Sequence, residues 1–205
     1  MGPGRLHALI DGVFAIALTL LVLDLPRPAH ATALMHELQQ QWPTYAAYLV
    51  SFATLGIIWI EHHGMMGAVR SIDRRLLELT LFFLLFVSII PWPTALAADY
   101  VNAGTRQARD VAILYAATML MMGLSFAWSW RYLGAHPELV AEPARRAFPA
   151  GTRRALLGAL AYVVAIAVAL ASPLASFALD GVVVVYFALS SSDVPGLIVT
   201  SSTHE

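Results

Sequence analysis

The chain has 205 residues, of which 59% are hydrophobic and only 12% are charged, and its formal net charge is −1. Its mean hydropathy is +0.71. Soluble domains are about 45–50% apolar and about 25% charged, so this composition argues against a soluble domain, a disordered chain or a nucleic-acid-binding protein. The chain has no cysteine, which excludes disulfides and thiolate chemistry. The sequence therefore predicts an all-α integral membrane protein.

Long uncharged runs predict where helices cross the membrane, because a helix needs about 20 apolar residues to span the hydrocarbon core. Three runs of 20 to 23 uncharged residues meet this length: 38–60, 79–98 and 111–130. A fourth run covers 155–179, but Pro173 interrupts it, because proline lacks the amide that a continuing helix requires.

Two shorter apolar runs, 12–23 and 181–192, become long enough only if Asp11 and Asp180 lie inside the membrane. With both included, the sequence predicts a bundle of six transmembrane helices near 5–25, 43–63, 76–97, 107–131, 153–171 and 174–190.

The first run has a second interpretation, a secretory signal peptide. Arg5, the apolar run and the segment Ala29-His30-Ala31 imitate the n-region, the h-region and the cleavage site of such a signal. However, Asp11 opens the apolar run, and the run ends at Asp24, several residues before the supposed cleavage site. A membrane span is therefore favoured.

The distribution of arginine predicts the orientation of the bundle. With six spans, nine arginines lie on the side of the two termini and three on the opposite side. The positive-inside rule then places both termini in the cytoplasm. We expect a short amphipathic helix over 29–41 at the outer surface, one transmembrane domain over 1–190, and a polar tail over 191–205.

Ionisable residues within membrane spans are costly and are therefore candidates for function. Four places qualify: Arg5 with Asp11, the cluster Glu61-His62-His63, Asp73 with Glu78, and Asp180. A metal site at His62 and His63 is one interpretation, but adjacent side chains on a helix point about 100° apart. A polar network between helices is favoured. Asp180 is either a structural cap after Pro173 or a titrating relay group, and the sequence leaves both open.

The first predicted helix carries an aliphatic stripe. At 100° per residue, Ile16, Leu20 and Leu23 fall within about 60° of one another, with Thr19 beside them. Asp11 lies about 140° from Ile16. By itself the stripe is also compatible with ordinary helix packing, because nearly every position of this helix is apolar.

Three segments resemble the transmembrane protein 175 family, which comprises lysosomal potassium channels of animals and shorter bacterial homologues. Residues 5–23, with Arg5 and Asp11 six positions apart, resemble its first helix, although Leu9 and Ile10 replace a Phe-Ser pair. Residues 51–63 resemble its second helix, and 84–95 resemble the end of its third.

The resemblance implies a homotetramer in which the first helix lines a central pore. Ile16, Leu20 and Leu23 then form the hydrophobic constriction, and Thr19 contributes to cation selectivity. Arg5 and Asp11 belong to a structural polar network that anchors this helix, with His62, His63 and Asp73 as further members.

The expected function is a potassium-permeable cation channel with modest selectivity for potassium over sodium, in a bacterial cytoplasmic membrane. Its partners are further copies of the chain, the lipid bilayer and monovalent cations, and K⁺ is the permeant ion. We expect no cofactor, metal, nucleic acid or enzymatic activity, because no nucleophile or phosphate-binding pattern occurs. The alternative is a proton-coupled or ion-coupled secondary transporter with Asp11 and Asp180 as relay carboxylates.

Overall fold

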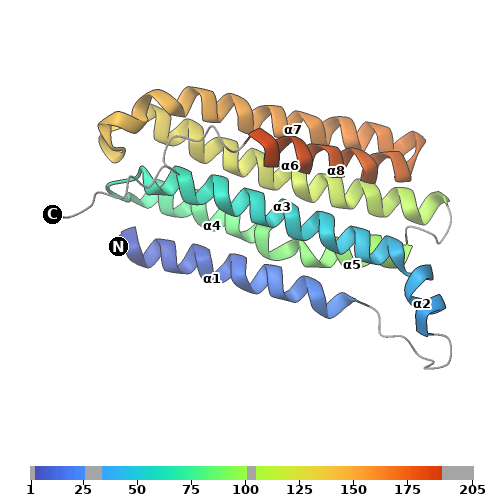
Figure 1. Ribbon diagram of the computed structural model, residues 1–205. Coiled ribbons are helices and arrows are strands. Elements are labelled where there is room, and N and C mark those ends of the chain that lie inside the picture. The colour runs from blue at the N-terminus through green and yellow to red at the C-terminus, as the bar shows by residue number, and fades with distance from the viewer. Residues whose placement is uncertain (1–2, 26–33, 101–104, 191–205) are drawn as a thin grey trace.

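The structure is a computed structural model that describes residues 3–25, 34–100 and 105–190. The described part is an all-helical bundle whose long helices run side by side along one direction (Figure 1). The α-helices are α1 (Pro3–Leu21), α2 (Leu34–Gln40), α3 (Trp42–Gly67), α4 (Arg74–Ile89), α5 (Pro91–Tyr100), α6 (Thr105–Ala135), α7 (Phe148–Ala171) and α8 (Pro173–Ser190). Short 3₁₀ turns cover Val22–Asp24, Pro137–Leu139 and Glu142–Ala147.

Five helical segments are long and apolar enough to cross a membrane: Gly4–Leu21, Trp42–Gly67, Arg74–Tyr100, Arg106–Ala135 and Glu142–Ala171. The sixth predicted position is occupied by α8, whose 18 residues rise about 27 Å, slightly less than the hydrocarbon core of about 30 Å. Several apolar helices of this length make the chain a multi-pass membrane protein.

Helix boundaries differ from the predicted ones where proline or a change of helix type intervenes. The predicted span 76–97 is divided between α4 and α5, because Pro91 has no amide to continue the helix. α1 ends at Leu21 and continues as a 3₁₀ turn, which puts Leu23 outside the regular helix. Of the predicted helix 29–41, α2 forms the part from Leu34; residues 26–33 and the predicted tail 191–205 lie outside the described residues.

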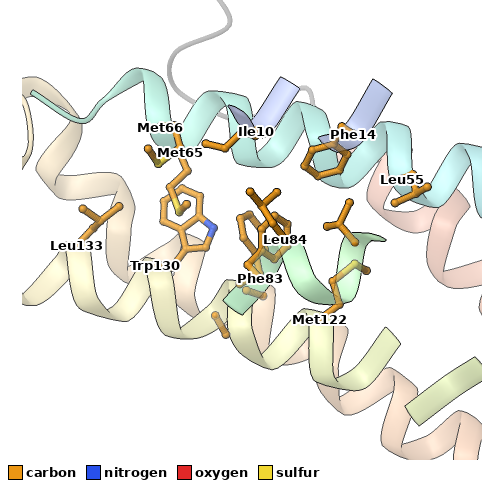
Figure 2. Packing of buried hydrophobic residues seen from close by; sticks show 14 of the residues in the cluster. Ile10, Phe14, Leu55, Met65, Met66, Phe83, Leu84, Met122, Trp130 and Leu133 are labelled. Carbon is orange, nitrogen blue, oxygen red and sulfur yellow. The ribbon is translucent and has the colours of Figure 1, made fainter. Parts of the chain in front are cut away.

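The hydrophobic core joins α1 to α3, α4 and α6. One face of α1 is buried in it, through Leu6, Ile10, Phe14, Ala17 and Leu21. In Figure 2, Ile10 and Phe14 point toward Phe83 and Leu84 of α4, with Met122 and Trp130 of α6 on the far side. Among the described residues, this buried face is thus the apolar surface by which α1 is attached to the rest of the chain.

The connections α3–α4 and α6–α7 meet at one end of the bundle. Ala68–Arg70 pairs with Leu139–Ala141 there: the Arg70 amide donates to the Leu139 carbonyl at 2.8 Å, and the Ala141 amide donates to the Ala68 carbonyl at 2.9 Å. Figure 1 shows that α1 begins at this same end and that α8 runs back toward it. The two arginine-rich connections and the beginning of α1 therefore lie together, as the alternation of spans predicts.

Candidate pore-lining face and its polar contacts

The aliphatic stripe of α1 faces away from the rest of the chain. Ile16 is 61% exposed, Leu20 41% and Leu23 72%, although all three are large apolar side chains. The opposite face of α1 is the buried one, so the helix is apolar on both faces. In a membrane protein such a helix contacts lipid or another subunit, or lines a pathway.

Thr19 lies on this exposed face, and its hydroxyl group contacts the helix backbone. The Oγ1–H lies 2.9 Å from both the Ala15 and the Ile16 carbonyl oxygens. The Thr19 hydroxyl proton is therefore used within its own helix, as is common for threonine in apolar helices. Because a hydroxyl oxygen also has two lone pairs, Thr19 retains the capacity to accept a hydrogen bond or contact a cation.

Asp11 connects α1 to α3 through Trp59. The Trp59 Nε1–H donates a hydrogen bond of 2.9 Å to Asp11 Oδ1. The Trp59 ring also lies 5.3 Å from the ring of His63, measured between centroids. Asp11 and His63 therefore share one tryptophan as their neighbour, whereas Arg5 is exposed and takes part in none of the ion pairs among the described residues.

His62 is enclosed by aromatic rings. It is 1% exposed, it stacks on Phe83 at a centroid distance of 4.8 Å, and Phe14 and Phe126 lie 6.4 and 5.9 Å away. Neither ring nitrogen hydrogen-bonds to any described residue. Within one chain His62 thus supports the packing of α1 through Phe14 and lies apart from the Asp11 contact.

Asp73 caps the N-terminus of α4. Its Oδ1 accepts a 2.8 Å hydrogen bond from the Leu76 amide, and its Oδ2 accepts one from the Tyr132 hydroxyl of α6. Partial burial tends to raise the pKa of Asp73, but the hydrogen bonds from Tyr132 and Leu76 outweigh it, so this pKa is lowered. In the single chain, Asp73 ties α4 to α6 and makes no described contact with the other four predicted network residues.

A buried ion pair joins α3 to α7. Arg154 Nη2 lies 2.7 Å from Glu61 Oε1, and both side chains are largely buried. The Arg154 guanidinium also lies 5.5 Å from the centre of the Phe187 ring of α8. Glu61 was a sequence candidate, but Arg154 was not, because nothing in the sequence distinguishes it from the neighbouring loop arginines.

Asp180 is almost fully buried, at 2% exposure, and neither of its carboxylate oxygens hydrogen-bonds to a described residue. The cap of α8 is Ser172, whose Oγ accepts a 3.3 Å hydrogen bond from the Ala175 amide. The interpretation of Asp180 as a cap is therefore wrong. In the part of the chain that the structure describes, no three His, Asp or Glu side chains gather closely enough to hold a metal ion.

Fold and site together define a multi-pass helical membrane protein in which one apolar face of α1 is not covered by the rest of the described chain. A solved structure has the same architecture: the crystal structure of a lysosomal potassium-selective channel TMEM175 homolog from Chamaesiphon minutus superposes with a TM-score of 0.83 at 34% identity, covering 92% of this chain and 97% of that one. A second crystal structure, of a variant of the potassium channel MtTMEM175 in complex with a nanobody fusion protein, shares the fold at a TM-score of 0.65 and 15% identity, covering 92% of this chain and 90% of that one.

Sequence comparison agrees with the structural match. The family model of the endosomal/lysosomal potassium channel TMEM175 matches residues 5–91. A potassium channel of Streptomyces collinus is 39% identical over 199 residues, 94% of each chain, and one of Chamaesiphon minutus is 36% identical over 92% of this chain and 95% of that relative. The human endosomal/lysosomal proton channel TMEM175 matches 52% of this chain but only 22% of its own length. The chain belongs to the TMEM175 family.

Proposed function

We propose that the chain forms a potassium-permeable cation channel in which the exposed face of α1 lines a central pore. The observation that carries the proposal is the apolar stripe of Ile16, Leu20 and Leu23, which is exposed on the side opposite the buried face of α1. Relatives covering more than nine tenths of the chain are named potassium channels, which supports the same function.

A single chain cannot form the complete wall of this pore, which requires several copies of the chain. Several copies, four by analogy with the family, surround the axis and cover the stripe. Their isoleucine and leucine side chains then form successive apolar rings. Such rings gate by dewetting, because a narrow apolar constriction does not hold water or hydrated ions.

Selectivity follows from the same rings and from Thr19. The sequence contains no Thr-Val-Gly-Tyr-Gly filter, so a ring of carbonyl oxygens does not replace the hydration shell. K⁺ is more weakly hydrated than Na⁺, so it loses less hydration free energy when an apolar ring removes part of its water shell. The free lone pairs of the Thr19 hydroxyl supply part of the missing coordination. We expect modest selectivity for potassium.

The polar residues of α1 hold it in register around the pore. Asp11 does so through Trp59 of α3. Arg5, exposed in the single chain, is available to an acidic group or a lipid phosphate at the subunit boundary. We assign the same anchoring function to His62 and His63, which contact Phe14 and Trp59 through their rings. We also assign it to Asp73, whose contact with Tyr132 joins α4 to α6.

If the chain has six spans, its arginine distribution supports a cytoplasmic-membrane protein with both termini inside the cell. A coupled secondary transporter is not favoured, because relatives along nearly the whole chain are named as channels.

Purified protein in a planar bilayer tests the proposal. Discrete current steps in symmetric potassium chloride are the expected result, together with a tetramer in native mass spectrometry. Uptake of potassium in a fixed ratio with another ion, and no current steps, would contradict it.

A further inference from the structure

A second feature of the bundle lies away from the α1 face. A cavity of about 320 Å³ opens between α3, α5, α6 and α8. Its walls are mostly apolar, and the ionisable or hydroxyl side chains that line it are Ser51, Tyr115 and Asp180. Small-molecule sites are typically cavities of about 300–1,000 Å³ with apolar walls and a few polar groups, and this cavity falls at the lower end of that range.

The side chain of Asp180 has no hydrogen-bond partner among the described residues. The side chain lines the cavity at 2% exposure, and both oxygens lack a hydrogen-bond donor. An ionised carboxylate in apolar surroundings is strongly unfavourable unless a cation or a donor compensates it. The cavity beside it is the place from which such a group can approach.

The hydroxyl groups at and beside the cavity do not donate to Asp180, because their protons already take part in other hydrogen bonds. Thr94 Oγ1 donates to the Ile90 carbonyl at 2.9 Å. Ser51 Oγ lies 2.8 Å from Thr94 Oγ1 and 3.0 Å from the Tyr115 hydroxyl, so Ser51 donates to Thr94 and Tyr115 donates to Ser51. This is the one assignment that satisfies all three contacts, and it leaves the Tyr115 oxygen as an acceptor.

We propose that this cavity binds a small organic ammonium ion with an apolar body, and that Asp180 is its counter-ion. The ammonium group brings a positive charge and several N–H donors to a site whose carboxylate and phenol oxygens are acceptors. Trp42, Phe177 and Tyr115 line the same cavity and suit both the cation and an apolar body. Ca²⁺ and Mg²⁺ take six or more oxygen ligands, which this lining does not offer.

The test uses the purified full chain in phosphatidylcholine nanodiscs, with 2-phenylethylamine as the probe and 2-phenylethanol as its neutral counterpart. Isothermal titration is expected to show the amine binding at least tenfold more tightly than the alcohol. Asp180→Asn should abolish this preference. Asp110→Asn is the matched control, because Asp110 is well exposed at the start of α6, and it should leave the preference unchanged.

A second variant keeps the test decisive if Asp180→Asn does not fold. Gly181 lines the cavity, and a Cβ placed there would be 4.0 Å from the nearest side chain, so Gly181→Leu fills space without removing the charge. It should weaken amine binding at least tenfold. Equal binding of amine and alcohol, no binding of either, or unchanged amine affinity in the variants would overturn the proposal. Because no current is measured, the result is independent of the proposed channel function.

Discussion

Ile16 and Thr19 are adjacent in space on the uncovered face of α1, and in the proposed pore they divide two tasks between an apolar side chain and a hydroxyl group. Ile16 exposes a large aliphatic surface, which in the proposed assembly excludes water from the pore. The Thr19 hydroxyl donates its hydrogen bond to the helix backbone, and its oxygen lone pairs stay available as acceptors. Each task has its own substitution and its own electrical readout.

Ile16→Asn is expected to raise single-channel conductance and reduce discrimination among cations, because amide groups keep the narrow ring hydrated. Single-channel recording in potassium and sodium chloride measures both quantities. Leu160→Asn is the matched control, since Leu160 is 57% exposed on α7 and lies off the α1 stripe. Unchanged conductance and selectivity in Ile16→Asn, or an equal change in the control, would remove Ile16 from the constriction.

Thr19→Val keeps the branched shape and removes the polar oxygen. If that oxygen contributes about 1 kcal/mol to the preference for potassium, selectivity should fall roughly fivefold while current persists. The reversal potential under potassium/sodium bi-ionic conditions measures this change. An unmoved reversal potential with normal current would make Thr19 a packing residue only.

At the residue scale, the sequence can indicate only features that one helix alone determines. The stripe at Ile16 and Leu20 follows from helical periodicity, and both side chains are exposed as a group. The partners of the charged residues depend on neighbouring helices, so periodicity could not supply them. The Trp59 contact of Asp11 and the Arg154 contact of Glu61 were therefore missed.

At the scale of elements, α1 is attached by a buried apolar face and by one polar contact to α3. Asp11→Ala should lower the free energy of unfolding by about 1 kcal/mol, because it removes the acceptor of the Trp59 hydrogen bond. Trp59→Phe removes the donor and should reduce stability as well.

Thermal unfolding of the two single variants and of the double variant measures the coupling between Asp11 and Trp59. If they act through one hydrogen bond, the double variant should lose less stability than the sum of the single losses. Strict additivity, or normal stability and assembly of Asp11→Ala, would show that this contact does not hold α1.

The stability contributed by the contact between α4 and α6 depends on pH, and the sign of this dependence follows from the pKa of Asp73. Its pKa is lower in the folded chain than in the unfolded one, so its contribution is present above the unfolded pKa of about 3.9 and is lost as the pH falls through the folded value. Asp73→Ala should therefore cost about 1 kcal/mol near neutral pH and less below pH 4. Melting curves from pH 3 to 7 provide the measurement, and a difference that stays constant over this range would contradict the assignment.

One predicted span is divided into α4 and α5, because counting uncharged residues does not detect a break in the helix. Residues 79–98 are uncharged and long enough for one helix, but Pro91 interrupts the backbone hydrogen bonding. The proline is visible in the sequence, whereas the place at which α1 changes to a 3₁₀ turn is not marked by any such residue. Helix existence was therefore predictable here, and helix boundaries were less so.

For the whole molecule, the sequence indicates the antiparallel order of the helices and the grouping of arginine-rich connections, and Figure 1 displays that arrangement. What a single chain does not determine is the surface that further copies cover. In the proposed channel, the exposed stripe of α1 lines a pore only after several copies of the chain assemble. The central claim is therefore that ions pass along this face.

Cysteine accessibility tests this claim most directly, because the natural chain contains no cysteine and needs no prior substitution. We expect currents through Ile16→Cys and Leu20→Cys channels to be blocked by a thiol-reactive cation applied from the aqueous side, while the unsubstituted channel and the Leu160→Cys control continue to conduct. Block of the α1 variants alone is the predicted result. Persistent current in both α1 variants, with their thiols shown to be modified, would contradict the placement of the pore along α1.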